Sequence, residues 1–298
     1  MTEDILQNSA SSPPAIVTAN WLLTHLDDPG VAIADCRFSL LEPDAGRQQY
    51  QHSHIPGAVY FDLNADLSGP VQRHGGRHPL PNPAALAQKL AASGITRGET
   101  WVIAYDDSRL GFASRFWWLL RYLGHDRVAV LDGGFSGWRA MGYPVEMADT
   151  ARPTRDAGRF VPALRPEMVV DIKTVKQRKD QTGVVLVDSR ESDRYRGERE
   201  PIDPIAGHIP GAVNYPWQGA TDDQGQALSA EAQRQRWQDL PNANEIDEII
   251  VYCGSGVTAC VNLLSLELAG RGSQSKLYAG SWSDWCSYLL DESGETLA

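Results

Sequence analysis

The sequence predicts an α/β protein of two tandem domains, each a mainly parallel sheet flanked by helices. One observation is an internal repeat, in which a set of short motifs occurs twice along the chain. Another is that short apolar strands alternate with helical segments within each copy. The third is the length, because 298 residues exceed what one ordinary hydrophobic core serves.

The repeat consists of four pairs of matched positions. They are His54–Val59 with His208–Val213 at an offset of 154 (208 − 54), Ala34-Asp35-Cys36-Arg37 with Val187-Asp188-Ser189-Arg190 at an offset of 153 (188 − 35), and, at an offset of 147 (248 − 101), Trp101–Tyr105 with Glu248–Tyr252 and Trp138 with Trp285. A short insertion or deletion accounts for the change of offset. The chain therefore contains two copies of one domain.

Apolar β-branched runs predict the strands of each copy, and amphipathic stretches predict its helices. The expected strands are Val31–Asp35, Val102–Tyr105, Val128–Leu131, Val184–Asp188 and Ile249–Tyr252, and the expected helices include Ala84–Ser93, Ser114–Leu123 and Val257–Ala269. Parallel α/β sheets bind ligands beyond the carboxyl ends of their strands. We therefore expect functional residues directly after Tyr105 and Tyr252.

These elements predict an N-terminal domain at residues 15–146, a linker at 147–165 and a C-terminal domain at 166–292. The linker is rich in Pro, Arg, Asp and Thr and has no apolar period. Met1–Pro14 has neither the basic start nor the apolar stretch of a secretory signal, so none is expected.

Cys253 stands where an apolar strand ends and a helix begins. Gly254 and Gly256 permit the backbone angles of a tight loop, so that successive N–H groups up to Thr258 can point at the sulfur. The helix dipole behind the loop favours the thiolate over the thiol. A cysteine at a strand end is more often a small buried hydrophobe, but this glycine-rich setting favours a nucleophile.

The other three cysteines, Cys36, Cys260 and Cys286, lack such a setting and are interpreted as structural. In the first copy the position that matches Cys253 is Asp106, which cannot act as a sulfur nucleophile. Only the second copy is therefore expected to be catalytic. Four cysteines without a Cys-x-x-Cys pair suit the reducing cytosol and argue against a disulfide framework, so a cytoplasmic location is expected.

The charge of the chain limits its partners. A formal net charge of −11 disfavours nucleic acids and anionic membrane surfaces. No run approaches the roughly 18 apolar residues of a membrane span. Because the overall field repels anions, an anionic substrate would need a local basic pocket.

The duplicated motifs and the loop Cys253–Thr258 resemble those of the tandem rhodanese-type sulfurtransferases, and the match covers nearly everything from Ala15 to Leu290. The resemblance implies two rhodanese-like domains, the first inactive and the second active. The loop sequence CGSGVT is typical of 3-mercaptopyruvate sulfurtransferases, whereas thiosulfate sulfurtransferases more often have a basic residue there. The resemblance further implies a substrate-binding role for the loop residues Gly254, Gly256, Val257 and Thr258.

The resemblance also implies the chemistry. Cys253 would take sulfur from a small anionic donor, 3-mercaptopyruvate or thiosulfate, as a persulfide, and release pyruvate or sulfite. A thiophilic acceptor such as cyanide, a small thiol or a reduced thioredoxin would then remove the outer sulfur in a ping-pong cycle. No cofactor or metal is expected, because the loop N–H groups serve the thiolate and the persulfide alike.

Anionic donors need cations, and Arg190 and Arg194 match the family's Asp-x-Arg and Arg-[Phe/Tyr]-x-Gly positions. A guanidinium suits a carboxylate or a pair of thiosulfonate oxygens. Arg194 is expected to contact the donor, whereas Arg190 can equally brace the domain by pairing with Asp188. Mercaptopyruvate enzymes usually have a further Arg in the next Pro-rich stretch, where this chain offers only Arg199.

Relatives that use mercaptopyruvate also have a Ser-His-Asp relay, which could protonate the departing pyruvate enolate. Ser255 lies in the loop, and His78 begins a matching His-Pro-Leu-Pro stretch of the N-terminal domain. Where relatives have the relay Asp this chain has Asn64, so Asp66 is the expected replacement.

Three further positions carry expectations. His54 and His208 each begin a His-Ile-Pro-Gly turn, and a structural capping role is expected for them. Relatives commonly have Asp where Ala279 stands, so the loop-bracing hydrogen bonds of that carboxylate are expected to be absent or replaced.

The sequence leaves other functions open. Cysteine-based phosphatases share the strand-loop-helix arrangement, but their loop is one residue longer and ends in Arg, where this chain has Ala259. A thiosulfate-preferring rhodanese would use the same loop. A persulfide carrier, which receives sulfur from a desulfurase and hands it to a partner, would use the same Cys253.

Overall fold

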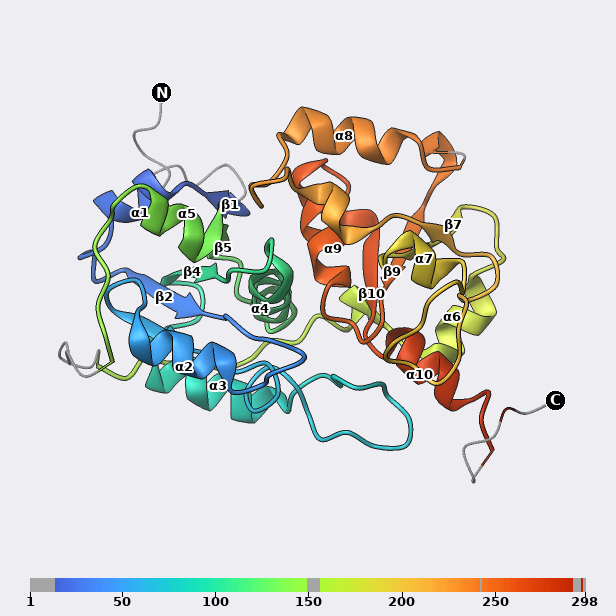
Figure 1. Cartoon of the computed structure of the whole chain (residues 1–298), viewed down its shortest axis with the longest axis horizontal. Coiled ribbons are helices and arrows are strands. Elements are labelled where there is room, and N and C mark those ends of the chain that lie inside the picture. Colours follow the sequence, from blue (N-terminus) through green and yellow to red (C-terminus); the bar gives the residue numbers. More distant parts are fainter. Residues whose placement is uncertain (1–13, 149–155, 242, 292–295, 297–298) are drawn as a thin grey trace. The chain divides into compact units, whose positions relative to one another are not determined.

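The computed structural model describes residues 14–148, 156–241, 243–291 and 296, and the chain divides into two compact units (Figure 1). The first contains Met1–Asp66, Pro83–Leu164 and Gln224–Gln226, and the second contains Leu67–Asn82, Arg165–Asp223 and Ala227–Ala298. The segment Leu67–Asn82, here called the arm, was assigned by sequence to the N-terminal domain but groups with the second unit. The predicted N-terminal stretch, the centre of the predicted linker and the predicted end at residue 292 lie outside the described residues.

The first unit is built on a parallel sheet of five strands in the order β1-β5-β4-β2-β3. Its strands are β1 (Ile16–Val17), β2 (Val31–Asp35), β3 (Ala58–Tyr60), β4 (Trp101–Tyr105) and β5 (Val128–Leu131). Its helices are α1 (Ala19–Thr24), α2 (Ala45–His52), α3 (Pro83–Ala92), α4 (Gly111–Tyr122) and α5 (Gly134–Ala140). The predicted helices Ala84–Ser93 and Ser114–Leu123 correspond to α3 and α4.

The second unit repeats this topology with the strand order β6-β10-β9-β7-β8, again with all pairs parallel. Its strands are β6 (Val169–Val170), β7 (Val184–Asp188), β8 (Val213–Asn214), β9 (Glu248–Tyr252) and β10 (Ser275–Tyr278). Its helices are α6 (Ile172–Arg178), α7 (Ser192–Tyr195), α8 (Ala230–Gln238), α9 (Ala259–Leu268) and α10 (Ser281–Ser287), with short 3-10 turns at Pro166–Met168, Trp217–Ala220, Ala243–Glu245 and Gly272–Gln274. The predicted fold class, two parallel α/β domains, is confirmed.

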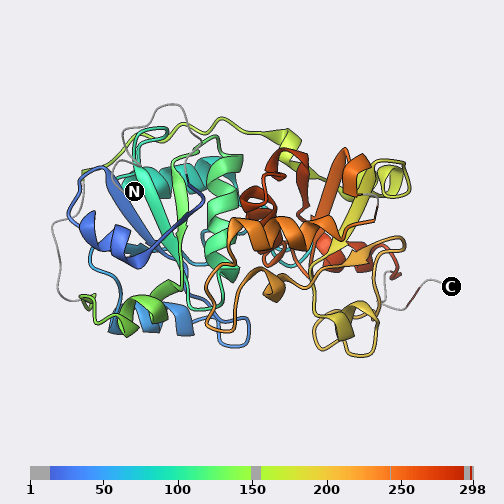
Figure 2. The ribbon, with the colours of Figure 1, turned by 90° about the horizontal axis from the view of Figure 1, so that it is seen from above.

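Each sheet carries helices on both faces because its central strands are apolar on both sides. Strands β2, β4 and β5 are buried along their whole length, which is the pattern of a covered parallel sheet. In the first unit α1 and α5 pack into one core cluster with alternate strand residues, and α4 lies against β4 and β5 on the other face (Figure 2). This leaves the carboxyl ends of the strands to carry the loops.

The repeated motifs build the same brace in both units. Arg37 pairs with Asp35 at 2.5 Å, and Arg190 pairs with Asp188 at 2.6 Å. The Tyr that ends the central strand accepts a hydrogen bond from the backbone of the His-Ile-Pro-Gly turn at 3.2 Å in each case. His54 and His208 place Nδ1 2.7 Å from a backbone carbonyl oxygen and stack on a tyrosine ring. Both histidines are engaged within the turn, where a structural role was expected.

No helix in the part of the chain that the structure describes combines the length and the apolar character required to cross a bilayer. The four cysteines are all free and buried.

Candidate active site

The loop after β9 holds Cys253 at the start of α9. Gly256 donates its N–H to the Cys253 Sγ at 3.2 Å. Its φ of +77° lies in the left-handed region, and a Cβ there would come within 2.3 Å of the Ala279 carbonyl oxygen. A glycine is therefore required at this position for the loop to turn one amide toward the sulfur.

The segment after β10 fixes the backbone of Cys253. Ser281 accepts a hydrogen bond from the Cys253 N–H at 3.1 Å, and the Trp282 N–H donates to the Cys253 carbonyl at 3.0 Å. Ser281 has a φ of +58°, a left-handed conformation that is unfavourable for a residue with a side chain. Such a conformation is found only where the surrounding structure stabilises it. Ala279 offers no carboxylate, and Asp284 takes a bracing role by accepting hydrogen bonds from Tyr278 and Gly75.

The arm brings His78 to the loop. His78 Nδ1 lies 2.7 Å from Ser255 Oγ, and both side chains are buried. The Gly75 N–H donates to Asp284 at 2.7 Å and the Arg77 N–H donates to Ser283 Oγ at 3.2 Å, so the arm is tied to α10 on either side of Gly76. A serine hydroxyl and an imidazole in contact can pass a proton at neutral pH.

Two arginines face the same loop. A Cβ on Gly254 would lie 3.1 Å from Arg77 Nη2 and 3.7 Å from Arg194 Nη2. Both guanidinium groups also pair with Asp203, whose side chain is buried. Burial raises the pKa of Asp203 from its usual value, and Arg77 opposes this shift. The cationic pair beside the thiol loop is thus Arg77 with Arg194.

The family model for the rhodanese-like domain matches twice, at residues 18–141 and 171–288. The chain belongs to the rhodanese family. This confirms the resemblance found in the sequence.

Individual rhodanese relatives are similar over almost their whole length. A protein from Pseudomonas aeruginosa named "Probable 3-mercaptopyruvate sulfurtransferase" is 44% identical over 277 residues, which are 92% of this chain and 95% of that protein. The thiosulfate sulfurtransferase of Cricetulus griseus is 32% identical over 283 residues, 91% of each chain. The crystal structure of SseA from Escherichia coli, a 3-mercaptopyruvate sulfotransferase, aligns with a TM-score of 0.78 and 33% identity over 91% of this chain and 99% of that one.

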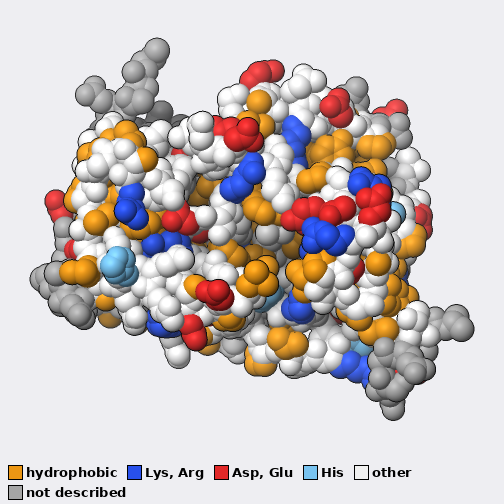
Figure 3. Space-filling model, in the orientation of Figure 1, with side chains coloured by type: hydrophobic (Ala, Val, Ile, Leu, Met, Phe, Trp, Pro, Cys, Tyr) orange, Lys and Arg blue, Asp and Glu red, His pale blue; other side chains and the backbone are white. Residues whose placement is uncertain are grey.

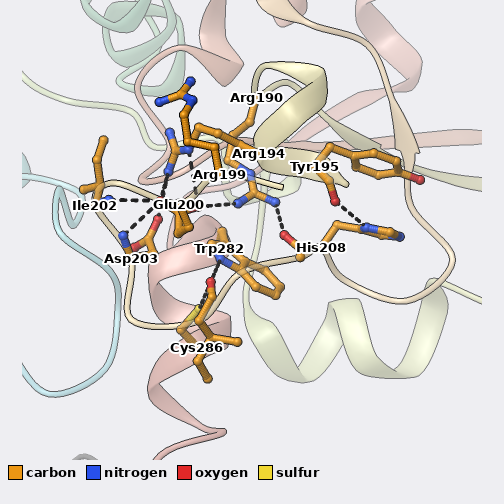
Figure 4. Close-up of polar contacts among 12 residues, drawn as sticks. Arg190, Arg194, Tyr195, Arg199, Glu200, Ile202, Asp203, His208, Trp282 and Cys286 are labelled. Carbon is orange, nitrogen blue, oxygen red and sulfur yellow. Dashed lines mark hydrogen bonds and ion pairs between the residues drawn. The ribbon is translucent and has the colours of Figure 1, made fainter. Parts of the chain in front are cut away.

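The rhodanese position Arg190 lies apart from the pair at the thiol loop. Its guanidinium donates to Asp188 at 2.6 Å and to the Gly207 carbonyl at 2.6 Å. It also donates to Glu200 at 3.2 Å (Figure 4). The side chain is 1% exposed and lies over the Trp282 ring. Although burial lowers the pKa of Arg190, the hydrogen bonds with Asp188 raise it above its usual value. These contacts favour the bracing role over donor binding.

Arg199, the candidate for the further donor-binding Arg, pairs with Asp193 at 2.6 Å and is half exposed. On the face shown in Figure 3, such basic and acidic side chains lie next to one another. The cation that reaches the loop in its place is Arg77, which sequence reasoning missed. The sequence could have indicated Arg77, because this residue directly precedes the stretch beginning at His78 that matches the family.

Asp66, the expected third member of the relay, belongs to the first unit. Its carboxylate accepts the Asp62 N–H at 2.7 Å and pairs with the Lys89 ammonium. The structure thus assigns Asp66 two partners within its own unit, and its role in the relay stays a prediction.

The loop of the first copy closes around its own side chain. The Asp106 carboxylate accepts backbone N–H groups at 2.8 to 3.2 Å from Ser108, Leu110, Phe112 and Ala113. Burial raises the pKa of Asp106 from its usual value, against the effect of these hydrogen bonds. The Asp106 carboxylate thus occupies the N-terminal end of α4, where an anion would otherwise bind, and it has no sulfur to transfer.

The remaining thiols have structural surroundings. Burial raises the pKa of Cys286 to about 12 and, with Asp35, raises the pKa of Cys36 well above its usual value. Cys260 donates to the Gly256 carbonyl at 3.5 Å from the first turn of α9. Neither Cys36 nor Cys286 is therefore ionised near neutral pH, which suits the structural role expected from the sequence.

Proposed function

We propose that Cys253 takes a sulfur atom from 3-mercaptopyruvate, holds it as a persulfide and passes it to a thiophilic acceptor. The chain is a sulfurtransferase of the rhodanese family, whose named relatives use 3-mercaptopyruvate or thiosulfate. The observation that carries the proposal is the convergence of three groups at one loop: the Cys253 thiol, the Ser255–His78 pair and the Arg77–Arg194 pair.

The donor is held by its charge. The carboxylate of 3-mercaptopyruvate would bind the guanidinium nitrogens of Arg77 and Arg194 that face Gly254, because hydrogen bonds between a guanidinium and a carboxylate are stronger than neutral ones. The glycine leaves space for these guanidinium groups. The donor sulfur would then lie next to the Cys253 thiolate.

The Cys253 thiolate attacks the donor sulfur, a new S–S bond forms, and the C–S bond breaks with its electron pair on carbon, giving the enolate of pyruvate. Ser255, in contact with His78, supplies the proton that converts the enolate into pyruvate. The Gly256 N–H stabilises the sulfur before and after transfer, so no metal or cofactor enters the step.

An acceptor completes the cycle. Cyanide, a small thiol or a thioredoxin-type protein attacks the outer sulfur and regenerates the Cys253 thiolate. Since the four free thiols survive in a reducing compartment, we place the reaction in the cytoplasm.

Intact-mass measurement of the full chain tests this proposal. Incubation with 3-mercaptopyruvate should add one sulfur atom, and subsequent cyanide should remove it and yield thiocyanate. The gain should vanish in Cys253→Ala and persist in the matched control Cys260→Ala, whose thiol lies on the next helix. A gain retained in Cys253→Ala would refute the assignment, and loading without repeated turnover would favour the persulfide carrier.

A further inference from the structure

A row of alternating charges leads from the brace at β7 to the thiol loop. Its members, in order, are Asp188, Arg190, Glu200, Arg194, Asp203 and Arg77. The successive ion pairs measure 2.6, 3.2, 2.7 and 3.2 Å, and Asp203 and Arg77 are in direct contact. Among the described residues these six groups form ion pairs only with one another. Three carboxylates and three guanidinium groups give a formal charge of zero.

Asp203 links the two arginines of this row that face the thiol loop. Its two carboxylate oxygens bind different arginines, Oδ1 to Arg77 and Oδ2 to Arg194. Its side chain is 1% exposed, and its backbone N–H donates to Glu200 at 3.0 Å, which fixes its position (Figure 4). The negative charge of Asp203 therefore acts on both loop-facing cations at short range and with little screening by water.

Arg77 Nη2 and Arg194 Nη1, which take no part in these ion pairs, lie 3.1 and 3.8 Å from the point where a Cβ on Gly254 would stand. A donor that binds there meets guanidinium groups whose charge is already balanced by Asp203 and Glu200. The site still offers directional N–H groups to one carboxylate. It has no excess positive charge for a second negative charge.

We propose that Asp203 sets the charge selectivity of the donor site, so that a monoanionic α-keto acid is accepted in preference to a dianion such as thiosulfate. This inference rests on the proposed function, because it concerns the donor of the same Cys253 loop. It assigns the preference to a residue that neither touches the sulfur nor belongs to the loop.

The test is Asp203→Asn in the full chain, which removes the charge and keeps the shape. The ratio of kcat/KM for 3-mercaptopyruvate to that for thiosulfate should fall about tenfold at low ionic strength, and the difference should shrink in high salt, as expected for one added unit of positive charge. Glu198→Gln is the matched control, because Glu198 lies in the same segment and pairs with Arg196 at the surface. That variant should leave the ratio unchanged.

A purely positional role of Asp203 gives a different result. Asparagine would then weaken both donors by the same factor, and an unchanged ratio would overturn the proposal. If Asp203→Asn does not fold, inhibition of the wild type decides: pyruvate should inhibit at lower concentration than sulfate, and tighter inhibition by sulfate would overturn it. Failure of the wild type to load Cys253 from either donor is a separate result, which refutes the proposed function instead.

Discussion

The loops after β4 and β9 occupy the same place in two copies of one fold, yet they use the end of the following helix in opposite ways. In the first, four backbone N–H groups bind the Asp106 carboxylate. In the second, the Gly256 N–H binds the Cys253 sulfur, which can form a bond to a donor. The residue at the start of the loop thus decides whether the N–H groups hold a structural carboxylate or support a nucleophile.

The largest effect is expected from giving the second loop the residue of the first. Cys253→Asp has no sulfur to extend, so we expect sulfur loading and turnover to fall below detection. The free energy of unfolding should fall by about 1–3 kcal/mol, because the β9 loop is not shaped to satisfy a buried carboxylate as the Asp106 loop is. Intact mass after donor treatment and urea denaturation measure the two quantities. Sulfur gain in this variant would show that another thiol carries the reaction.

The next effect concerns the amide that faces the sulfur. In Gly256→Ala the new Cβ meets the Ala279 carbonyl, so the loop must shift and the hydrogen bond to Cys253 is lost. We expect kcat/KM to fall about a hundredfold, as for the loss of one well-placed donor.

A matched control separates the clash from the backbone strain. Gly270 has a φ of +79° but open space around its Cβ position. Gly270→Ala should therefore cost about 1 kcal/mol of stability and leave kcat/KM unchanged. Equal kinetic losses in the two variants would mean that general destabilisation, and not the amide, explains the first result.

Much of the fold and of both loops could be predicted from the sequence. The parallel strands, the loop at Cys253 and the loss of the nucleophile at Asp106 follow from local patterns and from comparing the two copies. The strands β1, β3, β6, β8 and β10, of two to four residues, escaped prediction because so short a run carries little periodicity, whereas β5 was predicted at its observed bounds.

The pair Arg77–Asp203 beside the thiol loop escaped prediction for another reason, although Arg194 was predicted. Arg77 contacts Asp203 across 126 positions of sequence, and no local pattern encodes such a pairing. The same holds for the arm, which by sequence belongs to the first copy and by contacts groups with the second unit. His78 could be named because a motif match pointed to it, whereas the relation of Asp66 to it depends on placement that no motif determines.

A smaller effect, confined to stability, is expected from emptying the first loop. Asp106→Ala leaves four N–H groups, three of them buried, without their acceptor, and we expect the free energy of unfolding to fall by about 2–4 kcal/mol. The folded fraction should load Cys253 as the wild type does, because the brace takes no part in the chemistry. Urea denaturation and single-turnover loading measure these quantities side by side. A loss of loading rate at full folding would assign the first copy a role in catalysis.

The smallest effect tests why the first loop tolerates a side chain where the second requires glycine. Arg109 matches Gly256 at the offset of 147 (256 − 109), and both have positive φ, 53° and 77°. Left-handed backbone costs a non-glycine residue about 1–2 kcal/mol, and glycine costs a similar amount through the entropy of the unfolded chain. In Arg109→Gly these terms oppose each other, so we expect stability to change by less than about 1 kcal/mol and kcat/KM to stay constant. A loss well beyond this in thermal or urea denaturation would show that the Arg109 side chain, and not the four hydrogen bonds of Asp106, holds the loop in its strained form.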